Sequence, residues 1–468
     1  MSISNIVTRN FLAFGSGEVI SRAIAFCTAI YLARVLGAEN YGIISFAIGV
    51  TLYLSKIADF AIDVIGIKEI ANAPDSVNQL ASSVLSIRLV FAVLLTGVSI
   101  LGVQLFLKGR ECTIISLYFV TLIPIAANTK WIHLGLENAW PIGLSRIVSE
   151  MFALGLVIVL VRNMYDLWGA PFAQIVGEFC FTLILMSLLK QQKYKIVFCW
   201  DLTRALPVFL SALPILGQAM LFLIIYNSDL IFLRLFRNSE SVGYYAAAYM
   251  LICFLANVGH SYGMSLLPTL TRLGANTSDE KSLYQTSIVH MYAVCLPISI
   301  GGCLLASQII KIGFGENYTN SILALQILIW CIPLSLLRIV PWAVLISICH
   351  QKDFLKIMIY SVITNIALNT LLVPKYGIIG AAVATVITET LSGVLMFKCA
   401  AHYELPFVAL RRFFRPTVAC LFMTGVLIVF RQSNIFVSFI SGVGTFGIAL
   451  TVLGGIRFRK GQFPALNI

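Results

Sequence analysis

The chain of 468 residues contains 59% hydrophobic and only 11% charged residues, and its formal net charge is +12. A soluble protein of this length cannot bury so much apolar surface, so the composition indicates a polytopic membrane protein and excludes a soluble globular one. Lysines and arginines lie mostly at the ends of apolar runs, where membrane topology and anionic headgroups explain them better than nucleic acid does. The cysteines are scattered singly, so we expect no disulfide and no metal site. We also expect no cofactor and no nucleic-acid partner.

Apolar runs follow one another along the chain with only short polar segments between them. Since about 20 apolar residues span a bilayer as a helix, these runs predict about fourteen membrane-spanning helices and an all-α fold. The expected spans are 10–34, 42–66, 80–107, 112–135, 142–162, 167–189, 206–235, 243–268, 284–308, 322–347, 355–373, 378–400, 414–430 and 434–456. Prolines inside these spans are expected to kink them; they are Pro124, Pro171, Pro214, Pro297, Pro333 and Pro341.

The distribution of lysine and arginine between these spans predicts the orientation of the chain. More of them fall on the side that holds the N-terminus, so we expect both termini in the cytoplasm. A repeat is also visible: YLARVLGAENYGIISFA (31–47) follows the first span and IFLRLFRNSESVGYYAAA (231–248) follows the seventh. The repeat predicts two six-helix lobes related by an axis along the membrane normal, at 1–200 and 201–405, followed by a helix pair at 406–468.

Charged residues inside the spans are the main functional signal, because a charge at mid-bilayer costs roughly 2.5–3.5 kcal/mol on insertion scales. The candidate anion-binding residues are Arg22, Lys56, Arg88, Lys130, Arg146 and Arg338. The candidate ion-coupling residues or charge partners are Glu18, Asp59, Asp63, Glu150, Glu178, Asp229 and Glu389. Because five of the six cations lie in the first half, we expect a cationic cavity there for an anionic, phosphate-bearing substrate.

Structural pairing is the alternative explanation for these charges. Three pairs have the spacing of neighbours on one helix face, namely Glu18–Arg22, Arg146–Glu150 and Lys56–Asp59. Three cations have no acid at such spacing and need a partner on another helix, a water-filled cavity or a ligand; these are Arg88, Lys130 and Arg338. Three acids lack a nearby cation and could be proton or sodium sites, or protonated packing residues; these are Glu178, Asp229 and Glu389.

Other sequence features restrict the kind of function. The sequence contains no G-x-x-x-x-G-K-[ST] motif, and its short polar segments leave no room for a catalytic domain outside the membrane. We therefore expect no intrinsic ATPase and no enzyme activity. In the stretch GSGEVISRAIAF, Gly15 and Gly17 are expected to make room for a neighbouring helix.

Several stretches, in order along nearly the whole chain, resemble the polysaccharide transporter family of O-antigen-type oligosaccharide flippases. They include LARVLGAENYGIISFA (32–47), DFAIDVIGIKEIA (59–71), SIRLVFAVL (86–94), KWIHLGLENAWPIG (130–143), SDLIFLRLF with VGYYAAAY (228–249), LLPTLTRL (266–273) and VPKYGIIGAAVATVITE (373–389). This family belongs to the superfamily that also contains the multidrug (MATE) exporters and the lipid II flippases.

The resemblance implies two six-helix lobes with alternating access to a central cavity. It implies a polyprenyl-diphosphate-linked oligosaccharide as substrate, moved from the cytoplasmic to the periplasmic leaflet of the bacterial inner membrane. It also suggests ion-gradient coupling, and the polymerase and chain-length components of the pathway as partners beside the lipid bilayer. Arg22 resembles the first-helix arginine that lipid II flippases use for the diphosphate, whereas their second arginine is replaced by Thr28 or a neighbour.

Two other functions remain open from the sequence. A cation-coupled multidrug or small-solute exporter would share the fold, with a cavity dominated by acids and usually twelve helices. A membrane polysaccharide polymerase or ligase would need a long periplasmic loop, and no such loop is found between the expected spans.

Overall fold

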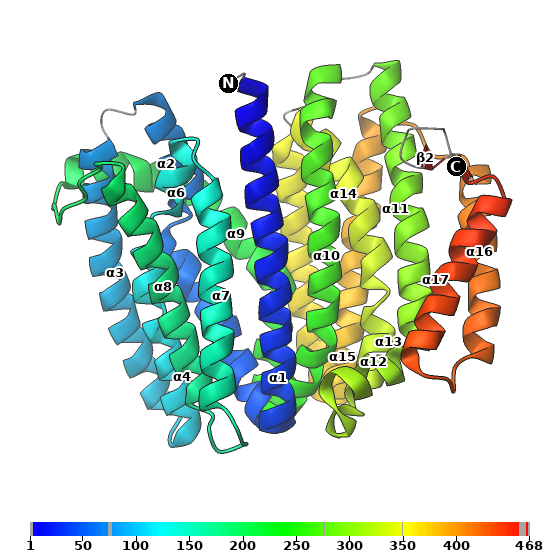
Figure 1. Ribbon diagram of the computed structural model, residues 1–468, viewed down its shortest axis with the longest axis horizontal. Coiled ribbons are helices and arrows are strands. Elements are labelled where there is room, and N and C mark those ends of the chain that lie inside the picture. Colours follow the sequence, from blue (N-terminus) through cyan, green and yellow to red (C-terminus); the bar gives the residue numbers. More distant parts are fainter. Residues whose placement is uncertain (1–2, 74–76, 275–276, 349, 458–464, 467–468) are drawn as a thin grey trace. The chain divides into compact units, whose positions relative to one another are not determined.

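The computed structural model describes the backbone of residues 3–73, 77–274, 277–348, 350–457 and 465–466. These residues are almost entirely helical (Figure 1), as expected, and the one pair of strands is short. The strands β1 (Ile456–Arg457) and β2 (Ala465–Leu466) are antiparallel.

Two glycines divide the longest helical runs. Twelve runs within the described residues are long and apolar enough to cross a membrane. Two of them contain a non-helical glycine, Gly37 (φ 76°) in α1 (Ile3–Asp59) and Gly377 (φ 57°) in α15 (Gln351–His402). Glycine adopts such left-handed conformations without a steric penalty, and each half retains about 20 residues or more, enough to span a bilayer. The expected count of about fourteen helices therefore agrees with the twelve runs.

The chain divides into two compact units, Met1–Gly243 and Tyr244–Ile468. The first unit contains α1, α2 (Ile62–Asn72), α3 (Val77–Phe106), α4 (Arg110–Val120), α5 (Leu122–Ala126), α6 (Lys130–Gly135), α7 (Trp140–Leu160), α8 (Gly169–Gln191) and α9 (Leu202–Phe236). Because α9 packs against α1, α2 and α3, this unit extends beyond the boundary expected at residue 200. The division into functional lobes of six, six and two helices stays a prediction.

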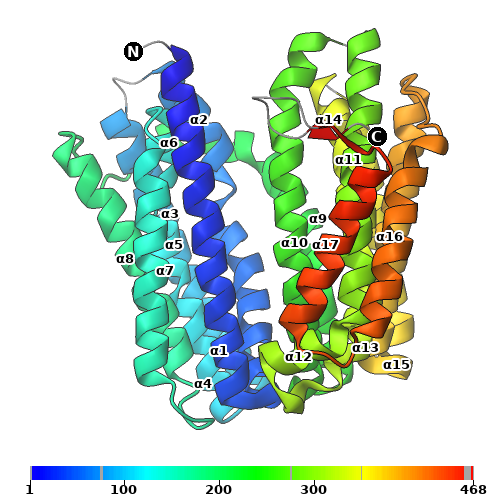
Figure 2. The same ribbon diagram turned by 45° about the vertical axis from the view of Figure 1, so that its right-hand side comes forward.

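The second unit begins within α10 and includes the C-terminal helices. It contains α10 (Ser239–Leu273), α11 (Ser278–Leu304), α12 (Ala306–Phe314), the 3₁₀ helix η2 (Glu316–Tyr318), α13 (Ser321–Leu328), α14 (Cys331–Ser347), α15, α16 (Arg411–Val429) and α17 (Ile435–Val452). The helices α16 and α17 lie side by side, and α16 also packs against α11 (Figure 2).

Proline explains two further helix ends. A proline ring clashes with the carbonyl group four residues earlier, which is Val120 for Pro124 and Ile329 for Pro333. Accordingly, α4 ends at Val120 and α13 ends at Leu328. Other expected kinks do not interrupt their helices: α9, α11 and α14 continue through Pro214, Pro297 and Pro341, and Pro171 lies in the first turn of α8.

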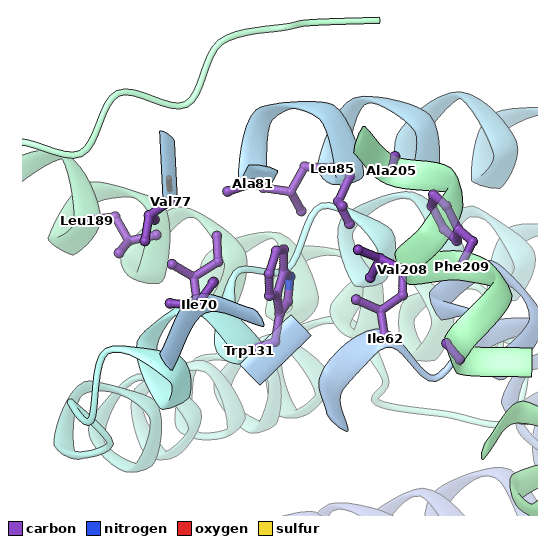
Figure 3. Close-up of a cluster of buried hydrophobic side chains, with 13 residues drawn as sticks. Ile62, Ile70, Val77, Ala81, Leu85, Trp131, Leu189, Ala205, Val208 and Phe209 are labelled. Atoms are coloured by element: carbon purple, nitrogen blue, oxygen red, sulfur yellow. The ribbon is translucent and has the colours of Figure 1, made fainter. Parts of the chain in front are cut away.

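A buried apolar cluster fixes the short helices α2 and α6 in the first unit. Trp131 of α6 lies at its centre, between Ile62 and Ile70 of α2 (Figure 3). The Trp131 ring packs so closely over Gly66 that a side chain at that position would overlap it. Residues of α3, α8 and α9 close the cluster. The start of α2 thus packs beside α3 and α9.

Candidate functional site

The helix expected at 42–66 is interrupted in its second half. Helix α1 ends at Asp59 and α2 begins at Ile62, and between them Phe60 and Ala61 adopt left-handed φ angles of 52° and 50°. Each such non-glycine residue costs of order 1–3 kcal/mol and persists only where surrounding packing holds it. Phe60 supplies part of that packing, since its ring lies 5.0 Å from the ring of Phe91 and 4.9 Å from that of Phe209.

An ion pair between Asp59 and Arg88 of α3 lies at this interruption. The two residues are only 8% and 1% exposed, and the Nε and Nη1 atoms of Arg88 have no hydrogen-bond partner among the described residues. The expected pairing of Asp59 with Lys56 is replaced by this contact. Arg88, which has no acid within one turn of its own helix, therefore finds its partner on another helix.

Five of the candidate residues gather around this interruption. Asp63, in the first turn of α2, interacts electrostatically with Asp59 and with the three cations Lys56, Arg88 and Lys130. We call these five residues the break cluster. It combines three positive and two negative side chains, so its formal charge is positive when all are ionised. An anion is the ligand that such a cluster favours.

A second group of candidates connects α1, α7 and α8. Arg22 pairs with Glu18 at 2.8 Å, and Arg146 pairs with both Glu150 and Glu178 at 2.9 Å. The two expected pairs at four-residue spacing are therefore present, and Glu178 finds a cation that its own helix does not supply. The guanidinium of Arg146 also lies 5.2 Å from the centre of the Phe181 ring.

The helices that carry this second group approach each other very closely. A Cβ atom at Gly17 of α1 would overlap the backbone of Gly143 of α7, whereas a Cβ atom at Gly15 would have no neighbour within 4 Å. The expectation that glycine makes room for a helix is confirmed for Gly17 and wrong for Gly15. The Glu18–Arg22 pair remains accessible beside this crossing, with side chains 39% and 48% exposed.

In the second unit, Arg338 of α14 pairs with Glu389 of α15 at 3.0 Å. Ser335 donates a hydrogen bond to Glu389 at 3.0 Å, and Arg338 donates one to Ser392 at 2.5 Å. The side chains of Arg338 and Glu389 are 16% and 3% exposed. These two candidates, each lacking a partner in its own helix, thus satisfy one another across two helices.

Two further polar residues of the first unit are completely buried, the candidate acid Asp229 and His133. Asp229 of α9 is completely buried and interacts electrostatically with Tyr53, whose hydroxyl donates a hydrogen bond to the carbonyl of Leu223 at 2.9 Å. His133 is also completely buried, and its Nε2 lies 3.1 Å from the carbonyl oxygen of Leu185. This contact makes His133 a hydrogen-bonded packing residue between α6 and α8.

The two repeat segments contact each other within the first unit. A Cβ atom at Gly42 would overlap the carbonyl of Ser239, and one at Gly243 would overlap the carbonyl of Ala38. Beside them, Arg234 pairs with Glu111, which also accepts a hydrogen bond from Ser239 at 3.0 Å. Glu111 is not among the sequence candidates because it lies just before the expected span 112–135, in the first turn of α4, where an acid is ordinary.

Residues 7–274 match the family model described as polysaccharide biosynthesis protein, which is more than half of the chain. The chain belongs to this family. It is 25% identical over 402 residues to a proposed O-antigen transporter of Shigella flexneri, with 81% of this chain and 94% of that protein covered.

Solved structures of low sequence identity share the fold of this polysaccharide biosynthesis protein. A lipid II flippase, MurJ, in an inward closed conformation has a TM-score of 0.74 at 14% identity, covering 94% of this chain and 98% of that one. An inward-facing multidrug resistance transporter of the MATE family, in the MOP superfamily, has a TM-score of 0.63 at 16% identity, covering 82% and 94%. The family member is thus a multi-pass membrane protein with relatives in bacteria.

The second unit of this polysaccharide biosynthesis protein contains an apolar cavity of about 380 Å³. Five aromatic residues contribute to its lining, Tyr284, Tyr292, Phe397, Phe407 and Phe413, the other lining residues are aliphatic, and none of them is charged. Within the described residues no group of three or more histidines, cysteines or acids is placed to hold a metal ion. None of the charged candidates lines this cavity, and anion binding by Arg22, Arg146, Arg338 and the cations of the break cluster stays a prediction.

Proposed function

We propose that this protein is a flippase for a polyprenyl-diphosphate-linked oligosaccharide, such as an O-antigen repeat unit. It moves this lipid by alternating access from the cytoplasmic to the periplasmic leaflet of the bacterial inner membrane. Family membership, a relative that is a proposed O-antigen transporter and the fold of a lipid II flippase support the proposal. The observation that carries the choice of an anionic substrate is the excess of positive charge in the break cluster.

The two arginines of the first unit have different parts in this proposal. Arg22 is half exposed and, among the described residues, pairs with Glu18 of its own helix, so a diphosphate can replace that carboxylate without any rearrangement of the backbone. Arg88 is buried, but two of its nitrogens have no hydrogen-bond partner among the described residues. Phosphoryl oxygens would satisfy them once the left-handed residues Phe60 and Ala61 relax and α2 moves away from Asp59.

The proposal also includes a driving force, a membrane orientation and partner proteins for this flippase. A proton or sodium gradient drives turnover, with Asp229 as the coupling acid because it is completely buried in α9. Both termini lie in the cytoplasm. The polymerase and chain-length components of the pathway receive the flipped product. The protein itself performs no catalysis.

A cation-coupled multidrug exporter is the second candidate. It is favoured by the similarity to the MATE transporter. It is also favoured by the group of Glu150, Glu178 and Arg146, in which two acids share one arginine and the formal charge is negative. The positive charge of the break cluster disfavours it, because an exporter of cationic drugs needs an acidic site.

The test is transport of a fluorescent polyprenyl-diphosphate oligosaccharide in proteoliposomes, with flipped molecules detected by a quencher that cannot cross the membrane. We expect wild-type protein to expose the label and Arg22→Ala to reduce the initial rate at least tenfold. Lys352→Gln, which removes an exposed lysine in the second unit, is the matched control and should transport normally. Efflux of a cationic dye with no movement of the lipid would favour the exporter instead.

The proposed role of Asp229 in ion coupling is tested by measuring lipid transport with and without an imposed ion gradient. Asp229→Asn should transport more slowly than wild type under an imposed gradient and at the same rate as wild type without one. If Asp229→Asn responds to the gradient as fully as the wild type, Asp229 is a structural residue.

A further inference from the structure

The connector between α8 and α9 is bound to the surface of α3 by a regular set of hydrogen bonds. The backbone N–H groups of Lys195, Val197 and Cys199 donate to Asn78 Oδ1, Ser82 Oγ and Ser86 Oγ at 2.9, 3.1 and 2.9 Å. The three acceptors are four residues apart and therefore line one face of α3. The backbone N–H group of every second connector residue thus points toward α3, as in an extended strand.

The serines in this arrangement have both of their hydrogen-bonding functions satisfied. Ser82 donates to the carbonyl of Asn78 at 2.5 Å, and Ser86 donates to the carbonyl of Ser82 at 2.7 Å. Each hydroxyl can therefore accept from the connector while its proton stays within α3. The end of the connector is fixed as well, because Arg204 pairs with Asp201 at 3.0 Å and donates to Gln79 of α3.

The other edge of the connector is open. In an extended chain the N–H and carbonyl groups of successive residues point in opposite directions. The N–H groups of Ile196, Phe198 and Trp200 consequently point away from α3, and they have no hydrogen-bond partner in the described part of the chain. Tyr194 and Ile196 pack against the apolar cluster around Trp131, which holds this edge in place.

The exposed side chains of the connector are cationic and apolar. Lys193 and Lys195 of the connector and Lys190 in the last turn of α8 are exposed, and no acid occurs from residue 190 to residue 200. Next to them Phe198 is 69% exposed and Trp200 is 59% exposed. Aromatic rings and lysines side by side are typical of segments at the membrane–water interface, where anionic headgroups attract the lysines.

We propose that the connector, residues 192–200, together with Lys190 in the last turn of α8, is a binding site for anionic phospholipid headgroups. Lys193 and Lys195 provide the charge, the open N–H groups of Ile196 and Phe198 provide donors for phosphate oxygens, and Phe198 and Trp200 lie among the acyl chains. An extended peptide could also pair with an open strand edge. The run of three lysines and the exposed aromatic rings favour the lipid, because they match a charged surface above an apolar layer.

The test is native mass spectrometry of the purified full-length protein with phosphatidylglycerol and, separately, phosphatidylcholine. Wild-type protein should retain phosphatidylglycerol preferentially, and K193Q/K195Q should lower its apparent affinity about tenfold without changing that for phosphatidylcholine. The matched control K352Q/K375Q removes two exposed lysines from the second unit and should change phosphatidylglycerol binding less than about twofold.

A second variant tests the attachment to α3. Ser82→Ala combined with Ser86→Ala removes two of the three acceptors but leaves every lysine, and it should also weaken the preference for phosphatidylglycerol. Equal losses in K193Q/K195Q and in K352Q/K375Q would show a nonspecific charge effect and overturn the proposal. A wild-type protein with no preference between the two lipids would overturn it too. An extended peptide paired with the open edge would then be the alternative ligand.

Discussion

Asp59 at the end of α1 pairs with Arg88 on α3, and this buried contact closes the interruption between α1 and α2. The contact joins two elements on either side of two strained residues, Phe60 and Ala61. An ion pair in this position holds the left-handed backbone in place, and its loss would allow α2 to move. The pair is therefore both a structural contact and the proposed position of a ligand-dependent change.

Replacement of Arg88 should separate these two roles. Arg88→Ala leaves the buried carboxylate of Asp59 without a partner, so we expect a loss of about 3–5 kcal/mol of stability. Arg88→Lys keeps the charge but cannot bind a diphosphate with two parallel hydrogen bonds, so we expect a smaller loss of stability and slow transport. Thermal unfolding in detergent and the proteoliposome assay measure the two effects. A fully active Arg88→Lys variant would restrict Arg88 to the structural role.

The Glu18–Arg22 pair predicts an asymmetry between two otherwise similar variants. Both side chains are accessible, at 39% and 48% exposure, so we expect the pair to contribute at most about 1 kcal/mol to stability. Glu18→Gln and Arg22→Gln should thus unfold at similar temperatures. Transport should nevertheless decrease about tenfold or more in Arg22→Gln and much less in Glu18→Gln, because only the arginine binds phosphate. Equal transport defects would identify the pair as a packing contact.

The close crossing of α1 and α7 predicts different effects of alanine at two neighbouring glycines. Gly17→Ala places a methyl group against the backbone of Gly143, which cannot yield as a side chain would, and should destabilise the protein by about 1–3 kcal/mol. Gly15→Ala meets open space and is the control, with an expected change in unfolding temperature near zero. If both variants unfold at the same temperature, the two helices can separate at this crossing without a penalty.

The start of α9 gives a prediction about pH. Asp201 caps this helix, and its pKa is lowered by the hydrogen bond from the Thr203 hydroxyl and, next, by the backbone N–H and guanidinium of Arg204. A carboxyl group whose pKa is lower in the folded state stabilises the protein above its unfolded pKa, and this contribution is lost as the pH falls. Between about pH 6 and about pH 3, the unfolding temperature of the wild type should therefore decrease more than that of Asp201→Asn. Parallel decreases would contradict this.

The membrane helices could be predicted from the sequence because bilayer thickness sets the length of an apolar run. The pairs Glu18–Arg22 and Arg146–Glu150 could be predicted because their spacing places both residues on one helix face. The pairs Asp59–Arg88, Arg146–Glu178 and Arg338–Glu389 could not, since each joins two helices whose packing the charges do not determine. The interruption at Phe60 and Ala61 was not predictable either, because neither residue is a glycine or a proline.

The contact between Gly42 and Gly243 has a consequence for how this protein can change over generations. The two glycines occupy corresponding places in the two copies of the repeat, and a side chain on either one would overlap backbone belonging to the other copy. Neither copy can therefore acquire a larger residue here on its own, since a substitution in one could not be accommodated by trimming a side chain in the other. The sequences of duplicated segments ordinarily diverge, but glycine should be retained at both of these positions.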